Sequence, residues 1–266
     1  AFGDGWDVVI SAGKGLGQRR RVISLDEENE TFNIEGEWDI IPDETSKFVF
    51  VIAAYGATIY NNYANSCSKG FWLYGDCIDC VVTENNLIDG EGVFGYTCYI
   101  LDENRARINV CYFNRMEENN TSGFSSKGKH CGIGIQAGVE TENTEHILVY
   151  GVDIKNNSIY GVIAIPKSSH VESEAPPING IYAVIPAWRV VIDNGFTVMK
   201  GITVENNKIS KMDRGISVGN ASEIKLENAG KTVKKSATQT IVLKNNVLES
   251  VNNELIDPLN EAINIK

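Results

Sequence analysis

The chain has 266 residues, with 24 Lys and Arg against 35 Asp and Glu, and so a formal net charge of −11 at pH 7. This acidic balance argues against nucleic acid and anionic membrane surfaces as main partners. No run of 18 apolar residues occurs, so we predict no membrane insertion. The N-terminus has neither an initiator Met nor a basic and apolar leader. We therefore expect a processed or excised piece of a larger extracellular protein, secreted or held at the cell surface.

The first part of the chain, residues 1–46, has the pattern of short strands separated by turns. We predict strands at 8–10, 21–24, 31–34 and 38–41, with turns at 13–17 and 26–30. This segment is interpreted as a β entry or cap segment that leads into the repetitive part of the chain, residues 47–266.

Pairs of Asn recur beside Val and Ile in the remaining chain, although Asn is poor in strand interiors. Residues 202–209 (ITVENNKI) align with 241–248 (IVLKNNVL), and 57–64, 80–88 and 152–159 follow the same pattern, with 110–116 as a degenerate copy. The spacing is 24 residues from Asn62 to Asn86, and 50 from Asn157 to Asn207, which we interpret as two units. A period in the low twenties built from alternating strands is typical of a β-solenoid repeat protein.

A parallel β-helix gives these Asn a physical role, because equal positions of successive coils stack at strand spacing, ~4.8 Å. One bend residue adopts the left-handed conformation, which Asn tolerates. An inward Asn at the bend can bond neighbouring backbone and stack on the Asn of the next coil, forming an Asn ladder. We therefore predict an all-β fold, a right-handed parallel β-helix over 47–266, with insertions near 117–129, 168–196 and 221–237. Such loops commonly wall a binding face.

The front of the chain carries a more specific pattern: GKGLGQRRRVIS at 13–24, TFNI at 31–34 and WDIIPDETSK at 38–47. Together with the Asn-rich coils, this pattern resembles right-handed parallel β-helix proteins of the pectate-lyase-like superfamily, of the bacterial secreted kind. The resemblance covers most of the chain and implies the fold. It leaves the activity open, because this fold carries many functions.

All six cysteines lie within one stretch of 65 residues, at positions 67, 77, 80, 98, 111 and 131. The Cys77-x-x-Cys80 spacing lacks the second close pair of a zinc site and the helix start of a redox motif. We favour buried, reduced cysteines that pack as small hydrophobic residues, with disulfides and a metal site as the alternatives.

Carboxylates follow the aromatic strands of successive coils. A β-helix lyase needs a cation, often Ca²⁺, and an Arg or Lys base, whereas a hydrolase needs two or three carboxylates on one face. We expect Asp76, Asp102 and Glu140 to stack into an acidic row, with Asp76 and Asp102 as catalytic candidates. Asp102, Glu103 and Glu140 are the candidate ligands for Ca²⁺. The alternative is a solvated edge of turn acids.

Lys129 and His130, at the end of the first insertion, are the other catalytic candidates, as a base or a carboxylate clamp; the alternative is that they are plain loop residues. Candidate substrate-binding residues are aromatic side chains that can stack on sugar rings and one cation. These are Trp72, Tyr74, Tyr99, Trp188 and Arg105.

The sequence therefore favours an extracellular carbohydrate-active or carbohydrate-binding protein whose partner is a polysaccharide, with a lyase or glycoside hydrolase as the enzyme classes. The alternative is a surface or adhesion module, or a tail-spike-like receptor-binding module. We expect a monomer, and a trimer for the spike-like alternative.

Overall fold

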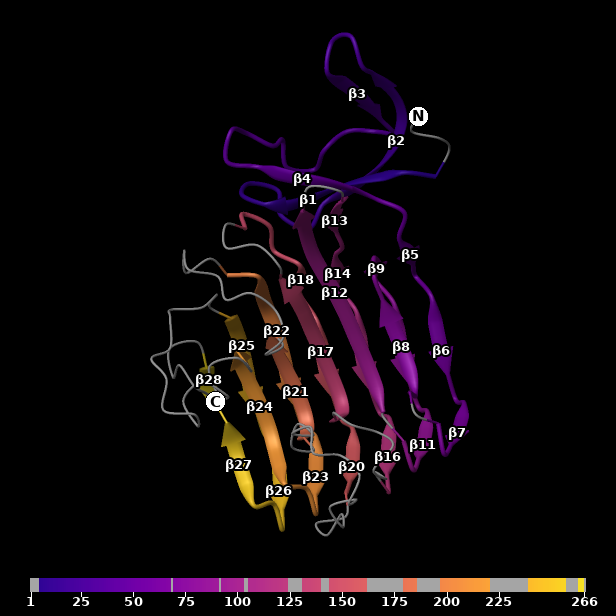
Figure 1. The fold of residues 1–266 in the computed structure, drawn as a ribbon, viewed down its shortest axis with the longest axis vertical. Helices are drawn as coiled ribbons and strands as arrows, with labels where there is room; N and C mark the ends of the chain where they lie inside the picture. The colour runs from indigo at the N-terminus through magenta and orange to yellow at the C-terminus, as the bar shows by residue number, and fades with distance from the viewer. Residues whose placement is uncertain are drawn as a thin grey trace.

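The computed structural model describes residues 5–67, 69–90, 92–102, 105–123, 131–139, 144–161, 179–185, 197–220, 239–256 and 263–265. Over these residues the protein is all-β, and every regular element is a strand (Figure 1). In the same ranges no helix has the length and apolarity needed to cross a membrane.

An antiparallel entry sheet precedes the repetitive part and has the strand order β3-β2-β1-β4. Its strands are β1 (Asp7–Ala12), β2 (Arg19–Asp26), β3 (Thr31–Ile34) and β4 (Lys47–Val51). Because β4 pairs with β1, this sheet extends beyond the predicted boundary at residue 46. Residues 38–41, predicted as a strand, form none.

The glycine-rich pattern of the entry segment is explained by close backbone contacts. Gly13 has a φ of 72°, and a Cβ there would lie 2.0 Å from the carbonyl oxygen of Thr45. The side-chain amide of Gln18 donates to the carbonyl of Ile40 at 2.8 Å and accepts from its N–H at 2.8 Å. Residues of the two patterns at 13–24 and 38–47 therefore contact one another and stabilise the entry segment.

After β4 the chain passes in turn through an eleven-stranded, a six-stranded and a seven-stranded sheet, and then returns to the eleven-stranded sheet (Figure 1). Each pass adds strands to these three sheets, and we call one pass a coil. The eleven-stranded sheet holds β5 (Ala54–Tyr55), β6 (Thr58–Tyr60), β9 (Cys77–Ile78), β10 (Val81–Thr83), β14 (Cys111–Tyr112), β15 (Arg115–Glu117), β18 (Val149–Tyr150), β19 (Asp153–Lys155), β22 (Met199–Glu205), β25 (Gln239–Lys244) and β28 (Ile263–Ile265). The six-stranded sheet holds β7 (Tyr63–Asn65), β11 (Asn86–Ile88), β16 (Asn120–Ser122), β20 (Ser158–Tyr160), β23 (Lys208–Ser210) and β26 (Val247–Glu249). The seven-stranded sheet holds β8 (Phe71–Tyr74), β12 (Val93–Asp102), β13 (Arg105–Ile108), β17 (Cys131–Val139), β21 (Asn179–Ile185), β24 (Arg214–Asn220) and β27 (Asn253–Ile256).

Strand pairing within these three sheets is parallel, apart from the antiparallel hairpin of β12 and β13. The parallel register stacks one inward apolar residue per coil. In the eleven-stranded sheet this row consists of Ile59, Val82, Met116, Ile154, Val204 and Leu243. Such an arrangement is compatible with a solenoid-like fold, in which stacking supplies a core that a single coil lacks.

An Asn ladder runs through the bend between the eleven-stranded and six-stranded sheets. Its members are Asn62, Asn85, Asn119, Asn157, Asn207 and Asn246. At each step the backbone N–H and the side-chain Nδ2 of one Asn donate to the Oδ1 of the Asn in the next coil, at 2.9–3.2 Å. The predicted ladder is therefore present.

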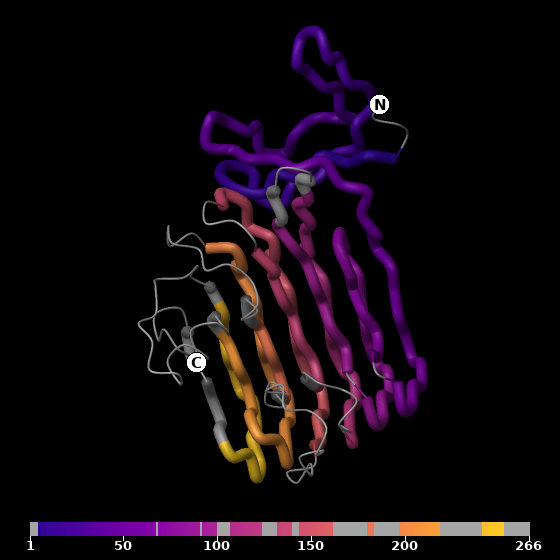
Figure 2. Tube along the Cα trace, viewed as in Figure 1, coloured from indigo at the N-terminus to yellow at the C-terminus, as the bar shows by residue number. Residues whose placement is uncertain are grey.

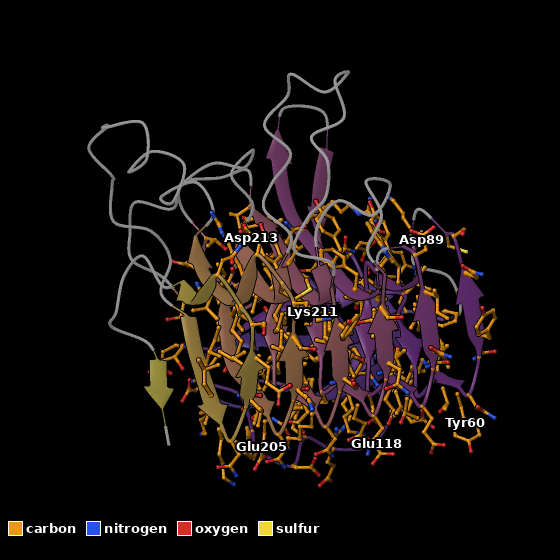
Figure 3. All side chains as sticks on the ribbon, turned by 90° about the horizontal axis from the view of Figure 1, so that it is seen from below. Tyr60, Asp89, Glu118, Glu205, Lys211 and Asp213 are labelled. Atoms are coloured by element: carbon orange, nitrogen blue, oxygen red, sulfur yellow. The ribbon has the colours of Figure 1, made fainter. Side chains whose placement is uncertain are left out.

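The residue before each ladder Asn has the left-handed conformation. It is itself an Asn in four coils, at 61, 156, 206 and 245, and a glutamate in two, Glu84 and Glu118, with φ between 52° and 58°. Figure 3 shows Glu118 and Glu205 along this edge of the coils, with Asp89 along the opposite edge.

Two details of the predicted repeat are wrong. Asn85 and Asn119 join the ladder, whereas Asn86 is an exposed residue of β11 and Asn114 lies at a different bend. Asn157 bonds directly to Asn207, so their spacing of 50 residues is one enlarged coil and not two.

Strands lie inside two of the predicted insertions: the range 117–129 contains β16, and 168–196 contains β21. The range 221–237 lies outside the described residues. The segments 124–130, 162–178, 186–196 and 221–238, also outside them, each directly precede or follow a strand of the seven-stranded sheet along the chain.

The entry sheet packs on the coils through an apolar cluster that includes Val9 and Val49 from the entry sheet and Ile78, Val110 and Tyr112 from the coils. In Figure 2 the entry segment, in indigo, lies across the upper ends of the coils. Burial of such side chains stabilises by roughly 1.5–3 kcal/mol each, so the entry sheet and the coils form one structure.

We expect Asn119→Ala to destabilise the protein by about 3–5 kcal/mol, because it removes the acceptor of the buried Asn85 N–H and Nδ2 and the Nδ2 donor to Asn157 Oδ1 and the Val82 carbonyl. The exposed Asn120→Ala is the matched control next to it and should cost under about 1 kcal/mol. Urea unfolding of both variants measures the difference, and equal losses would contradict the structural role of the ladder.

Glu84→Asn should stabilise the protein by about 0.5 kcal/mol, because Asn tolerates the left-handed conformation better than Glu does. Glu84→Gln, which removes the charge without that tolerance, is the control. Thermal unfolding should rank the Asn variant above both Gln and wild type, and a Gln variant that gains as much would assign the effect to charge.

Candidate functional site

The outer side of the seven-stranded sheet carries stacked aromatic side chains. The register pairs Trp72 with Phe94 and Tyr74 with Tyr96. The ring centroids of the first pair are 4.9 Å apart, and those of the second pair are 5.3 Å apart with nearly parallel planes. Because neighbouring residues of a strand point to opposite sides, Leu73 between them faces the core.

Tyr74 is the member of this group that offers its ring to solvent. Its side chain is 55% exposed, whereas Tyr96 and Phe94 are buried. Trp72 is half-buried, and the Lys69 ammonium lies 3.9 Å from its ring centroid. The stacked Tyr96 thus holds the Tyr74 ring flat from one side.

A chain of hydrogen bonds places a guanidinium beside Tyr74. Asp76 accepts from the backbone N–H of Val110 at 2.8 Å and from Asn109 Nδ2 at 2.9 Å. The Oδ1 of Asn109 accepts from Arg107 Nε at 2.8 Å. The exposed Arg107 guanidinium is therefore held 5.9 Å from the Tyr74 ring centroid.

We call Tyr74, Asp76, Arg107 and Asn109 the Tyr74–Arg107 site. Among the described residues, the terminal nitrogens of Arg107 have no hydrogen-bond or ion-pair partner. An open planar donor beside an exposed aromatic ring can bind a ligand that has both an apolar face and hydrogen-bond acceptors.

Burial raises the pKa of Asp76 above its ordinary value of 3.8. The bonds from Val110 and Asn109 and the charge of Arg107 act against this rise but do not cancel it. Since each carboxylate oxygen accepts a bond from the protein, Asp76 positions Asn109 and Val110.

Asp76 and Asp102 do not form the predicted acidic row. The N–H of Asn109 bonds to the carbonyl of Cys98, and the intervening residues form the β12–β13 hairpin. The backbone of Asp102 is in register with that of Arg105 at the far end of that hairpin. The hairpin is an insertion in the coil, so Asp102 is carried away from Asp76, and the predicted cation Arg105 goes with it.

The remaining catalytic and metal candidates, Glu103, Lys129, His130 and Glu140, lie outside the described residues, as does Trp188. Within the described ranges, no group of three or more His, Cys, Asp or Glu is arranged to hold a metal ion. The Ca²⁺ site that would use Glu103 and Glu140 stays a prediction.

Tyr99 is not the predicted surface platform. It is 7% exposed, belongs to the main core, and meets the His146 ring edge-on at 5.7 Å between centroids. Tyr99 is an odd number of residues from Tyr74's partner Tyr96, so it points to the other side of β12.

Arg107 and Asn109 are the site residues that are not among the candidates predicted from the sequence. Arg107 lies two residues after Arg105 in β13, but its position beside Tyr74 depends on the hairpin that returns the chain to the sheet. The sequence carries no Gly-containing turn signal for that hairpin, since residues 102–105 are Asp, Glu, Asn and Arg.

The cysteines that the structure describes are not joined in disulfides. Cys77, Cys80, Cys98 and Cys111 are buried, as predicted, and Cys67 is exposed. Cys77 and Cys111 stack on one another in neighbouring coils. The side chain of Cys131 lies outside the described set.

Comparison of the chain with protein-family models, with curated proteins and with solved structures finds no significant match. The family resemblance of the entry segment and coils is therefore not corroborated by these comparisons. What the structure contributes is the parallel register, the Asn ladder and the geometry of the Tyr74–Arg107 site.

The raised pKa of Asp76 predicts a pH effect with a definite sign. A buried carboxyl whose folded pKa lies above 3.8 costs stability while ionised, and this cost is relieved as the pH falls through the folded pKa. The free energy of unfolding of wild type, relative to Asp76→Asn, should therefore rise between about pH 7 and about pH 4.

Asp26 supplies the opposite control. Hydrogen bonds from Asn29 lower its pKa, so its stabilising effect is lost on acidification. Wild type relative to Asp26→Asn should accordingly lose stability only below about pH 4, where this carboxyl titrates. Urea unfolding from about pH 7 to about pH 2.5 measures both effects, and a wild type that loses stability relative to Asp76→Asn between about pH 7 and about pH 4 would contradict the assignment for Asp76.

Proposed function

We propose that this chain is a right-handed parallel β-helix, of the secreted pectate-lyase-like kind, that binds a polysaccharide at the Tyr74–Arg107 site. The fold proposal is supported by the repeated passage through three parallel sheets and by the six-membered Asn ladder. The resemblance of residues 13–47 to the entry pattern of such proteins adds to it.

The exposed Tyr74 ring with Arg107 beside it carries the binding proposal. A sugar ring has an apolar face of C–H groups that packs on an aromatic plane, and hydroxyl or carboxylate oxygens at its rim that accept from a guanidinium. Tyr96 stacks beneath Tyr74, so the platform is held before a ligand arrives.

The Asp76–Asn109 pair makes Arg107 a fixed donor. Asn109 is buried, and its amide is oriented by Asp76 on one side and by Arg107 on the other. Arg107 thus loses less side-chain entropy when it binds. In this proposal Asp76 and Asn109 are positioning residues, and the ligand contacts are made by Tyr74 and Arg107.

The long face of the seven-stranded sheet favours an extended ligand over a single sugar. Four segments outside the described residues adjoin strands of this sheet along the chain, which is the sequence arrangement expected of loops that wall a binding face. If the protein also cleaves the polysaccharide as a lyase or hydrolase, Lys129 and His130 remain the candidate catalytic residues.

We expect Tyr74→Ala and Arg107→Ala each to weaken polysaccharide binding by about tenfold, which corresponds to about 1.4 kcal/mol. The measurement is affinity electrophoresis against a panel of neutral and acidic polysaccharides, followed by calorimetry on the best ligand. The same panel is scored for unsaturated products and new reducing ends, with and without chelator.

Tyr160→Ala is the matched control, because Tyr160 is also an exposed Tyr beside a cation, with Lys211 Nζ 4.8 Å from its ring centroid, but lies on the six-stranded sheet. It should bind like wild type. Equal loss in Tyr160→Ala, or unchanged binding in both site variants, would reject the Tyr74–Arg107 site as the binding surface.

A further inference from the structure

We propose that Cys77 and Cys80 are a redox pair that closes into an intramolecular disulfide when the folded protein meets hydrogen peroxide. The disulfide would join the two ends of the bend between β9 and β10. This inference is independent of polysaccharide binding.

The bend brings the two side chains to the same side. Cys77 begins β9, Asp79 has the left-handed conformation with a φ of 55°, and Cys80 directly precedes β10. Both cysteines belong to the main core and are at most 4% exposed. Ile78 and the left-handed Asp79 lie between them and make the bend, so the inward side chains of Cys77 and Cys80 stand at its two ends.

The next coil shows the same bend with a different pair. Cys111 is in register with Cys77, and Asn114 occupies the place that Cys80 has in the coil before, since the residues that follow them, Arg115 and Val81, are in register. Asn114 Nδ2 lies 2.9 Å from Cys111 Sγ. Side chains at these two positions are therefore within contact distance, as a disulfide requires.

The two thiols differ in acidity. Their interaction with one another raises the pKa of Cys77 and lowers the pKa of Cys80. Cys77 Sγ lies 3.9 Å from the carbonyl oxygen of Tyr74, and Cys80 Sγ lies 3.5 Å from that of Ile78. We therefore assign Cys80 as the nucleophile of the pair and Cys77 as the thiol that resolves the intermediate.

Access comes from the first coil. Cys80 Sγ lies 3.3 Å from the carbonyl oxygen of Ala54 in β5, and both Ala54 and Ala57 are exposed. Among the described strands β5 pairs with β9 alone. A single thin layer of backbone therefore separates Cys80 from solvent, and hydrogen peroxide is small enough to pass it when β5 opens locally.

The chemistry balances in two steps. The Cys80 thiolate attacks one peroxide oxygen, the O–O bond breaks, and the products are Cys80 sulfenic acid and hydroxide. Hydroxide takes the Cys77 proton and becomes water; the Cys77 sulfur then attacks the sulfenic sulfur, and the S–O bond breaks as a second hydroxide leaves and is protonated by solvent. In sum, two thiols and one peroxide give one disulfide and two waters.

Cys111 is the competing partner, because it stacks on Cys77 in the parallel ladder. Its sulfur accepts the hydrogen bond from Asn114, and burial raises its pKa to about 12. Cys111 therefore stays a thiol under conditions in which Cys80 is ionised, and the structure assigns the disulfide to Cys77 and Cys80.

The test uses the full chain carrying Cys67→Ser, which removes the exposed thiol. The folded protein is treated with hydrogen peroxide, quenched, unfolded in iodoacetamide and digested without reductant. We expect the peptide with Cys77 and Cys80 to be lighter by two hydrogens and to carry no alkyl group there. Dithiothreitol should restore both alkylation sites, and Cys98 and Cys111 should be alkylated throughout.

Two variants test the assigned roles. In Cys77→Ser the Cys80 sulfenic acid should persist and be trapped by dimedone, whereas Cys80→Ser should leave Cys77 alkylated. Cys98→Ser is the control and should keep the disulfide. Full alkylation of Cys77 and Cys80 after peroxide treatment, or a Cys77–Cys111 disulfide, would overturn the proposal. Because the mass of the peptide is read in the chain with native Cys77 and Cys80, the result does not depend on how those two variants fold.

Discussion

The buried amide ladder is the interaction on which the coils depend. Each inner member, such as Asn119, donates to the Asn of the following coil and accepts from the Asn of the preceding one, while its Nδ2 also reaches the carbonyl of Val82. An amide with no partner in this core would cost more than a matched bond returns. The ladder therefore allows only one register between neighbouring coils, because a shift by one residue would leave all the ladder amides without their hydrogen bonds.

The same register builds the surface site. Once the inward row of β8 and β12 is fixed, the outward residues must pair as well, and Tyr74 comes to lie on Tyr96. The hairpin after Cys98 then returns the chain at Asn109, whose N–H bonds to the carbonyl of Cys98. Arg107 reaches Tyr74 because core packing has already set where the hairpin begins and ends.

The repeat and its ladder follow from the sequence because Asn is a poor strand residue, so its regular recurrence beside Val and Ile indicates a stacked bend. The predicted alignment is off by one residue where the left-handed residue is Glu84 or Glu118, since a glutamate gives no signal for that conformation. At the site, the aromatic strand pattern predicts Tyr74, but it does not separate the outward Tyr96 from the inward Tyr99, and the charge pattern does not separate Arg107 from Arg105. Strand parity and an unsignalled hairpin decided those cases, and both depend on pairing partners that composition does not reveal.

In the second coil, the reactive thiols and the carboxylate that positions the Arg107 site lie close together at the bend between β9 and β10. Asp76 fixes Val110 and Asn109 from the residue just before Cys77, so the thiol pair and the anchor of Arg107 share a backbone segment. Most other coils place apolar residues at the two thiol positions, as Val149 and Val152 show, and such residues fill the core without further function. A bend that holds its shape with Val needs no thiols for folding. Cys80 and the partly buried Asp76 are thus not required to shape the bend, and they lie where the first coil leaves the core thinly covered.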